Sequence, residues 1–205
     1  DPLMEFKPAF VDVTYHREEY IERPRQGGGY DKISTKKRPG TVAICAAIMN
    51  KYQVEAVPHL ICGGFNKDET ENALIDLAFL GIENVLALRG DNLRDERNFT
   101  PEENGNSNSL ELIRQISDMN NGVYQDQELQ NATETNFCIG AAGYPEKHID
   151  AANMDSDLKF LKRKVDAGAE FITTQMFFDN QQYFDYVTKC RDFGINVPII
   201  PGIKP

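Results

Sequence analysis

The sequence predicts an α/β fold built on a parallel sheet, because short apolar runs alternate with segments of helical spacing along the chain. The strand-like runs are residues 9–15, 54–62, 84–88, 137–142, 171–178 and 197–201. The helical segments between them are residues 41–52, 67–80, 107–121, 153–168 and 180–194. Regular alternation with short connections is typical of parallel strands joined by right-handed crossovers.

Glycines mark the ends of three helical segments. Gly81, Gly168 and Gly194 each stand between a helical stripe and the next apolar run. A glycine in the left-handed conformation commonly ends a helix, so each one predicts a helix end followed at once by a buried strand.

Six parallel strands fit either an open doubly wound sheet or part of an eight-stranded barrel. The chain opens on a segment that resembles the end of a helix and closes on a strand and a turn. One further strand ahead of residue 1 and one after residue 205 would complete a (β/α)8 TIM barrel. We therefore expect residues 1–205 to form a single, incomplete barrel domain without its first and last strands.

Composition limits the classes of function. The 205 residues are 40% hydrophobic, with a net charge of -10, and no apolar run approaches the roughly 20 residues of a membrane helix. We expect a cytoplasmic protein with no membrane anchor and no nucleic-acid partner, since nucleic acids attract basic surfaces. The cysteines lack CxxC spacing and the histidines lack zinc-site spacing, which predicts free thiols and no metal site.

Three polar segments interrupt the alternation. Residues 17–38 contain three consecutive glycines but no phosphate-binding motif, so we interpret them as a flexible lid. Residues 92–108 follow the strand 84–88, where barrels place substrate-binding loops. Residues 122–136 fall at the opposite end of the predicted sheet and are interpreted as decoration.

Polar and aromatic residues follow the predicted strands at their carboxyl ends. In a parallel barrel these positions converge on one mouth. A polar and aromatic set suits a planar, hydrogen-bonding ligand better than a metal ion. The set is Thr14, Tyr15, His59, Arg89, Gly90, Asp91, Tyr144, Glu146, His148, Gln175 and Asp179.

Each candidate has a plainer interpretation. The Arg-Gly-Asp triplet at 89–91 also occurs in adhesion loops, although those are exposed and flexible, whereas this triplet is joined to a buried strand. His59 could be a core histidine. Gln175 lies within an apolar run, and a buried amide needs partners, which favours a ligand-facing role. Arg163 and Lys164 would ordinarily form a solvated helix face.

Six motifs, in order along nearly the whole chain, resemble the methylenetetrahydrofolate reductase family. They are FVDVTY at residues 10–15, PHL at 58–60, LALRGD at 86–91, AGYPEKH at 142–148, KRKVDAGA at 162–169 and TQMFFD at 174–179. The resemblance implies a flavoprotein that reduces methylenetetrahydrofolate to methyltetrahydrofolate. It also implies a TIM barrel with FAD across its carboxyl face, NADH or NADPH as donor, ping-pong hydride transfer and a homo-oligomer.

The resemblance also assigns roles to residues. Asp91 is similar to the aspartate beside the flavin and the pterin, and Gln175 is similar to the glutamine shared by nicotinamide and folate; these two are the expected catalytic and substrate-binding residues. The expected cofactor-binding residues are Thr14, Tyr15, His59, Leu88, Arg89, Gly90, Asp91, Tyr144, His148, Asp157, Arg163 and Lys164. The last three resemble the group that holds the ribose and diphosphate, which replaces the solvated-face interpretation of Arg163 and Lys164.

The chain departs from the family pattern at several positions. The general-acid glutamate of the family falls upstream of residue 1, and its last strand and folate-contacting arginine fall after residue 205. Asn108 stands where the family has an aromatic residue near the flavin, Phe160 stands where it has an asparagine, and the loop at 26–30 is longer. We therefore expect little or no turnover from these 205 residues alone. The alternatives are a non-catalytic flavin- or pterin-binding fragment and another flavin barrel of the proline-dehydrogenase type.

Overall fold

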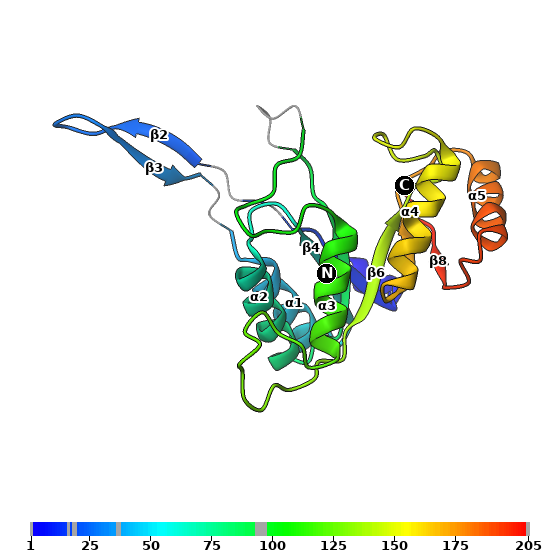
Figure 1. Ribbon diagram of the computed structural model, residues 1–205, viewed down its shortest axis with the longest axis horizontal. Helices are drawn as coiled ribbons and strands as arrows, with labels where there is room; N and C mark the ends of the chain where they lie inside the picture. Colours follow the sequence, from blue (N-terminus) through cyan, green and yellow to red (C-terminus); the bar gives the residue numbers. More distant parts are fainter. Residues whose placement is uncertain (1, 16, 18–19, 36–37, 93–97, 204–205) are drawn as a thin grey trace.

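A single curled parallel sheet forms the centre of the molecule in the computed structural model, which describes residues 2–15, 17, 20–35, 38–92 and 98–203 (Figure 1). Six strands pair in the order β1-β4-β5-β6-β7-β8, all parallel. This order follows the chain without a reversal, as in a barrel, whereas a doubly wound sheet reverses at a switch point. The strands are β1 (Phe10–Val13), β4 (Glu55–Ile61), β5 (Asn84–Leu88), β6 (Cys138–Gly143), β7 (Ala169–Thr174) and β8 (Ile199–Ile200).

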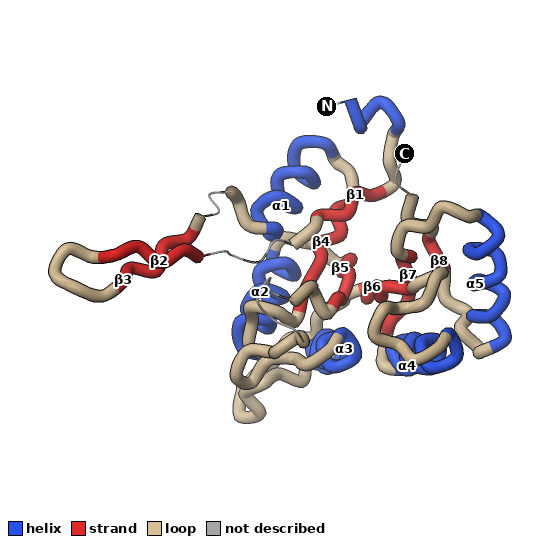
Figure 2. The backbone as a smooth tube through the Cα atoms, turned by 90° about the horizontal axis from the view of Figure 1, so that it is seen from above, coloured by secondary structure: helices blue, strands red, loops and turns tan. Residues whose placement is uncertain are grey.

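Five helices cover the convex face of this sheet, and the strands trace an open arc inside them (Figure 2). The helices are α1 (Thr41–Tyr52), α2 (Lys67–Phe79), α3 (Ser109–Asn120), α4 (Met154–Asp166) and α5 (Asn180–Asp192), preceded by a short 3₁₀ helix at Pro2–Phe6. The expected α/β class and the parallel curled sheet are confirmed, while closure into eight strands remains a prediction.

Local sequence signals set the helix ends. Asn66 and Asn153 each cap a helix through reciprocal hydrogen bonds with the third helical residue. Gly81 and Gly194 both have φ +72° and Gly168 has φ +121°, so all three predicted glycine helix ends are confirmed.

The main core lies between the convex face of the sheet and the helices. Val85, Ala87 and Ala141 are fully buried on the strands, and they belong to one cluster with buried helix residues such as Leu77 and Ile113. A strand with helices on one face and an enclosed interior on the other has a continuous apolar sequence. This explains why β5 could be identified from the sequence.

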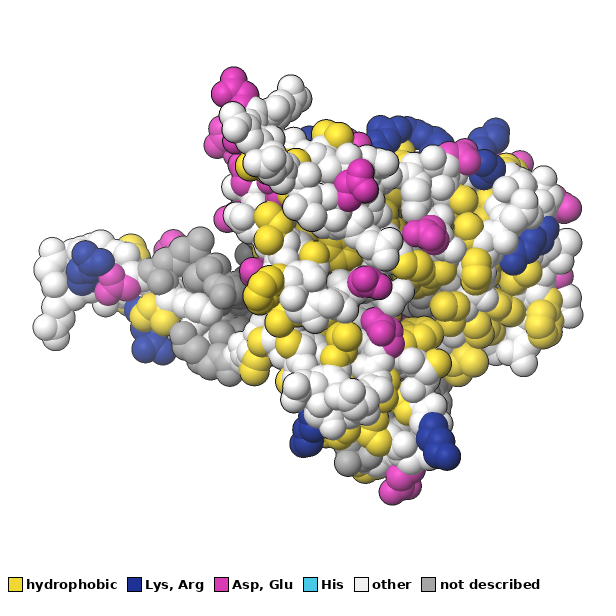
Figure 3. Space-filling model, turned by 90° about the horizontal axis from the view of Figure 1, so that it is seen from below, with side chains coloured by type: hydrophobic (Ala, Val, Ile, Leu, Met, Phe, Trp, Pro, Cys, Tyr) yellow, Lys and Arg dark blue, Asp and Glu magenta, His cyan; other side chains and the backbone are white. Residues whose placement is uncertain are grey.

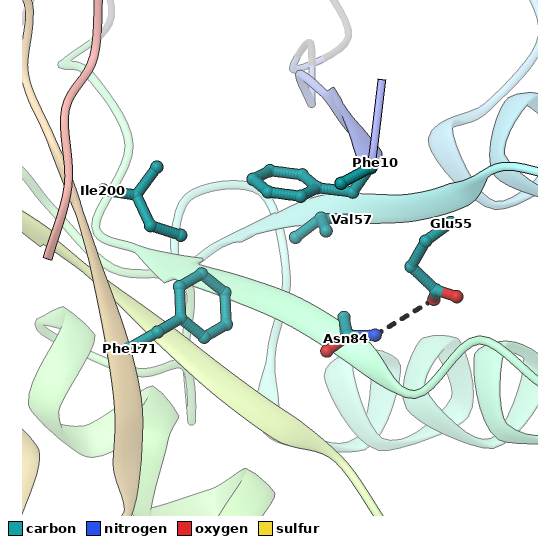
Figure 4. Close-up of a pocket in the computed structure, with 7 residues that line it drawn as sticks. Phe10, Glu55, Val57, Asn84, Phe171 and Ile200 are labelled. Carbon is teal, nitrogen blue, oxygen red and sulfur yellow. Dashed lines mark hydrogen bonds between the residues drawn. The ribbon is translucent and has the colours of Figure 1, made fainter. Parts of the chain in front are cut away.

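The concave face is apolar as well. Seen from below, hydrophobic side chains gather in the hollowed part of the molecule (Figure 3). A pocket there is lined by residues from the amino-terminal halves of several strands and from both edges of the sheet, so the sheet curls far enough for β1 and β8 to share one hollow (Figure 4). The lining residues are Ala9, Phe10, Glu55, Val57, Asn84, Phe171 and Ile200.

The segment 17–38 corrects the sequence interpretation. It contains an antiparallel hairpin, β2 (Tyr20–Pro24) and β3 (Tyr30–Ser34), rather than a flexible lid. Gly27, Gly28 and Gly29 all have positive φ and make the turn between the two strands. Figures 1 and 2 show the hairpin projecting away from the sheet and its helices.

Two further segments bear on the site. The predicted strand 171–178 is too long, because β7 ends at Thr174. Residues 122–136 lie at the amino-terminal end of the sheet, as expected, and Thr135 N–H donates to the Met119 carbonyl at the end of α3.

Among the described residues no helix is both long and apolar enough to span a bilayer.

Replacing Gly140 with alanine should destabilise the fold. An added Cβ would lie 2.3 Å from the Phe171 ring and 2.9 Å from Leu86 Cδ1, so two core side chains must shift. Overpacking of this kind costs about 1–3 kcal/mol, measurable by urea unfolding. Gly40→Ser is the matched control, since Gly40 is the amino-terminal cap of α1, where serine is favourable, and it has φ -67° with no atom within 4 Å of the added carbon. Equal losses in the two variants would contradict the packing described for the concave face.

Candidate active site at the carboxyl ends of the strands

The Arg-Gly-Asp triplet leaves β5 in a conformation that requires glycine. Gly90 has φ +86°, and a Cβ there would lie 3.2 Å from Ile61 Cβ on the neighbouring strand. The close approach turns the chain sharply at the strand end, and Asp91 is exposed directly after it. The triplet therefore lies at the mouth of the curled sheet rather than in a flexible adhesion loop.

Arg89 connects two of the loops around this mouth. Its Nη1 donates to Asp150 Oδ2 at 2.7 Å, in the loop after β6. Its guanidinium also lies 5.6 Å from the centre of the Phe99 ring, in the loop after β5. Cation–π contact and ion pairing together hold the cation at the rim.

Tyr144 and His148 form the rim beyond β6. Their rings meet edge to face with centroids 4.6 Å apart. Burial raises the pKa of the Tyr144 hydroxyl, and the charges of Asp157, Asp91 and Asp150 raise it further. The field of Asp91 reaches Tyr144, so the structure brings the ends of β5 and β6 into one site.

His148 is held by its backbone and kept neutral by burial. Its N–H donates to Asp157 Oδ2 at 2.8 Å, which joins the β6 loop to α4. Burial lowers the pKa of the imidazole, against the opposing effect of the Asp150 carboxylate. A neutral imidazole at pH 7 can donate one hydrogen bond and accept another.

Lys164 is the buried cation of the site. Only 5% of the residue is exposed, and its Nζ donates to the Ala142 carbonyl at 3.1 Å. Burial lowers the pKa of Lys164 to about 8, partly offset by the Asp157 carboxylate. Arg163, one position earlier on α4, is exposed, and the Phe160 ring lies within 6 Å of both cations. The family resemblance assigned these two cations to one group, and both lie in the last turn of α4.

The ends of β1 and β4 contribute the other side. Thr14 is exposed after β1, and the Tyr15 ring lies 5.1 Å from the Phe65 ring. His59 Nε2 lies 3.7 Å from Asp12 Oδ1, which is too long for a hydrogen bond, and it has no hydrogen-bond partner among the described residues. Leu88 is half-buried at the end of β5. A buried polar atom without a partner is more typical of a ligand site than of a core histidine.

Gln175 corrects one sequence inference. It was expected to be a buried amide, but it is exposed, because β7 ends one residue before it. Its backbone N–H donates to the Gly143 carbonyl at 2.8 Å, and its side-chain oxygen accepts from Met176 N–H. The residue still stands at the mouth, beside the end of β6.

Several contacts at the mouth were not predicted from sequence. Arg17 donates to Glu102 at 2.5 Å and its side chain lies against Gly64, which ties the base of the hairpin to the loop after β5. Phe99 and Asp150 flank Arg89 from two different loops. Each pair joins residues more than 50 positions apart or across a loop, so no local pattern could reveal it. Asn108, by contrast, is the amino-terminal cap of α3.

Comparison with known proteins places this arrangement in a family. The family model described as methylenetetrahydrofolate reductase matches residues 1–205. The chain belongs to the methylenetetrahydrofolate reductase family. It is 36% identical over 200 residues to methylenetetrahydrofolate reductase 2 of Saccharomyces cerevisiae and 35% identical over 214 residues to methylenetetrahydrofolate reductase (NADH) 1 of Arabidopsis thaliana. It is 33% identical over 210 residues to the 5,10-methylenetetrahydrofolate reductase of Escherichia coli.

The chain covers only part of each of these relatives. The alignments include 97–100% of this chain, but 29% of the yeast protein, 31% of the plant protein and 57% of the bacterial protein. Among solved structures, a 2,3-dimethylmalate lyase aligns with 78% of this chain and 57% of its own at a TM-score of 0.48 and 9% identity, a likeness on which nothing further rests.

The buried Lys164 predicts a pH-dependent stability. Its folded pKa of about 8 is below the ordinary 10.5, so between these values the unfolded state binds more protons than the native state. Stability of the ligand-free protein should therefore gain from this group as pH rises from about 8 towards 10.5. Urea unfolding at several pH values should show this gain, and Lys164→Met should abolish it. An identical pH dependence in the two proteins would contradict a buried, destabilised ammonium.

Asp157 should control that titration. Its carboxylate opposes the effect of burial, so Asp157→Asn should lower the pKa of Lys164 further. The amide oxygen can still accept from the His148 backbone, which limits the structural change. NMR titration of the lysine side chains measures the shift, with Asp155→Asn on the exposed side of the same helix as the control. A Lys164 titration unchanged in Asp157→Asn would refute the coupling.

Proposed function

We propose that the protein containing this chain reduces 5,10-methylenetetrahydrofolate to 5-methyltetrahydrofolate, with FAD as cofactor and NADH or NADPH as the hydride donor in a ping-pong cycle. The observation that carries the proposal is the convergence at one mouth of the Arg-Gly-Asp triplet, the Tyr144–His148 pair and the buried Lys164, in a chain of this family.

The site residues fit a flavin dinucleotide. Lys164 is a buried ammonium with three N–H donors, and the Ala142 carbonyl is the acceptor that the described residues give it. A buried cation is costly without an anionic partner, and a diphosphate would supply one, with Arg163 at its exposed side. Gly90 allows the backbone to come close to a planar ring, because no Cβ stands in the way.

The remaining cofactor contacts follow from position. Thr14, Tyr15 and His59 would border the flavin from β1 and β4, and Leu88, Arg89 and Tyr144 would border it from β5 and β6. His148 and Asp157 would act near the ribose and diphosphate. When bound, FAD would supply the hydride transfer between nicotinamide and folate, which no protein side chain can perform.

Asp91 and Gln175 would act on the substrate. The exposed Asp91 carboxylate would stabilise the positive charge that develops on the folate as its methylene bridge opens. The exposed Gln175 amide, with a donor and an acceptor, would bind the nicotinamide carboxamide and the pterin in turn. By resemblance the general acid of the family is not among these residues, and the activity is therefore proposed for the protein that contains this chain.

The setting of the reaction is part of the proposal. Cys45, Cys62, Cys138 and Cys190 are all free thiols, which suits the reducing cytoplasm. Burial raises the pKa of Cys45 and Cys62 to about 12, so both remain protonated and unreactive. The net charge of -10 gives no reason to invoke a nucleic-acid partner.

Asp91→Asn in the full-length protein should separate binding from catalysis. The amide keeps the shape and one acceptor but removes the charge, so folate-dependent reoxidation of the reduced protein should slow by about 10²-fold. FAD content and bleaching of the flavin by NADH or NADPH should change little. Stopped-flow absorbance measures the two half-reactions separately, and Asp126→Asn in the distant 122–136 loop is the matched control.

The outcomes distinguish the alternatives. Full-length protein that stays colourless after addition of FAD would refute the proposed function. Protein that binds FAD but is not bleached by either nicotinamide nucleotide would favour the non-catalytic flavin-binding alternative. An Asp91→Asn variant with unaltered folate reoxidation would remove Asp91 from catalysis while leaving the flavin site intact.

A further inference from the structure

Lys147 has a backbone conformation that is rare for a lysine. It ends the turn that follows β6, where its N–H donates to the Tyr144 carbonyl at 2.9 Å, and its φ is +80°. This left-handed region favours glycine, because a Cβ crowds the neighbouring carbonyl there. A residue in such a conformation needs contacts that fix it, and such residues are concentrated at ligand sites. We therefore expect the side chain of Lys147 to supply a contact that glycine could not.

The ammonium of Lys147 makes that contact with the segment directly after it. Its Nζ donates to the Ala151 carbonyl at 2.6 Å and to the His148 carbonyl at 2.8 Å, and it lies 3.5 Å from the Ile149 carbonyl. An ammonium has three N–H donors, so three carbonyls use its full capacity. Hydrogen bonds from a charged donor are also stronger than those between neutral groups. The side chain thus folds back onto its own loop instead of extending into water.

The segment that the ammonium holds is a second turn, residues 148–151. Ala151 N–H donates to the His148 carbonyl at 3.0 Å and closes this turn. Ile149 is 88% exposed, so apolar packing of its side chain does not hold the turn in place. The turn therefore depends on polar contacts, and Lys147 binds the carbonyls at both of its ends.

The conformation of this turn decides where the His148 imidazole carries its proton. The Asp150 N–H donates to His148 Nδ1 at 3.1 Å. A ring nitrogen that accepts a hydrogen bond has no proton, so the proton of the neutral ring is on Nε2. The Asp150 carboxylate does not change this assignment, because its Oδ2 is 3.8 Å from Nδ1 and accepts from Arg89 at 2.7 Å. The turn thus leaves Nε2–H as the hydrogen-bond donor of the ring.

We propose that Lys147 is a positioning residue of the flavin site, which holds the turn 148–151 and thereby presents the Nε2–H of His148 to the cofactor. Lys147 acts through backbone carbonyls and not through contact with the ligand. The same turn keeps Asp150 against Arg89 at the rim. The inference rests on the proposed function, because the ligand that meets His148 is the FAD proposed above.

The position of the proton determines whether His148 attracts or repels the cofactor. Diphosphate and ribose oxygens accept hydrogen bonds, so Nε2–H can donate to either. With the proton on Nδ1, the lone pair of Nε2 would face the same oxygen. Without the Lys147 ammonium the turn is free to open, the Asp150 N–H leaves Nδ1, and both tautomers are populated. Loss of the ammonium should therefore weaken FAD binding by about tenfold, the factor that corresponds to one ordinary hydrogen bond.

The first test determines the His148 tautomer in the full-length protein without FAD. Nitrogen NMR of isotope-labelled histidine, at about pH 8 where the imidazole is neutral, distinguishes a protonated from an unprotonated ring nitrogen. His148→Gln assigns the signals. The wild type should show the proton on Nε2, whereas Lys147→Gly and Lys147→Asn should show averaged shifts for the two nitrogens. Both replacements tolerate a positive φ, so each removes the ammonium without adding backbone strain, and circular dichroism checks that each folds.

The second test measures the FAD affinity of the same variants by flavin fluorescence. Both Lys147 variants should bind FAD about tenfold more weakly than the wild type. Lys7→Gly is the matched control, because Lys7 is also a lysine at positive φ, +48°, but is exposed and lies ahead of the amino end of β1. It should leave both the His148 tautomer and the FAD affinity unchanged.

The two measurements separate this inference from the proposed function. A wild-type protein with the proton on Nδ1, or Lys147 variants that keep the wild-type tautomer, would overturn the role of Lys147 whether or not FAD binds. Variants with an altered tautomer and wild-type FAD affinity would overturn the presentation of His148 to the cofactor. A wild type with the expected tautomer but no affinity for FAD would overturn the proposed function, and with it the assignment of this turn to a flavin site.

Discussion

The structure depends on one constraint: the buried positions of the central parallel strands exclude charged side chains, which therefore gather where the strands end. In β5 the buried Val85, Leu86 and Ala87 leave no room for charge, and Arg89 and Asp91 follow as soon as the strand stops. Because all the strands of the curled sheet are parallel, their polar ends meet at one rim. The site is therefore a consequence of how the core excludes charge.

The electrostatics of the rim follow from partial burial rather than from charge alone. Burial favours the neutral forms of three side chains: it raises the pKa of Tyr144 and lowers the pKa values of His148 and Lys164. The Asp157 carboxylate opposes the shift at Lys164. A carboxylate that binds the His148 backbone and acts on Lys164 couples the β6 loop to α4. Ionisable groups whose pKa values are shifted by burial in this way can respond to a charged ligand.

Local signals were sufficient for much of the fold. The prediction of a helix over roughly residues 41–52 is confirmed, and α1 ends where Gln53 adopts the left-handed conformation. Glycines at 81, 168 and 194 fixed three helix ends. The hairpin at 20–34 was missed because the glycine run was interpreted as flexibility, and because the residues on either side do not alternate apolar and polar side chains as a half-buried strand does.

The candidate site was predictable in its residues but not in its contacts. Gln175 was expected to be buried, since the apolar run 171–178 does not show that β7 stops at Thr174 and that Phe178 turns outward. The pairing of Arg89 with Phe99 and Asp150 depends on the loops after β5 and β6 meeting in space, so it had no local sequence signal. The residues at the rim could therefore be identified from the sequence of each strand alone, whereas the contacts between them depend on tertiary packing.

The most direct measurement of the central claim is a crystal structure of the full-length protein grown with FAD. The account predicts the isoalloxazine ring across the carboxyl ends of the strands beside Asp91 and Gly90, with the diphosphate within hydrogen-bond distance of Lys164 Nζ. A flavin bound elsewhere, or a Lys164 that keeps only the Ala142 carbonyl as its partner while FAD is present, would contradict it.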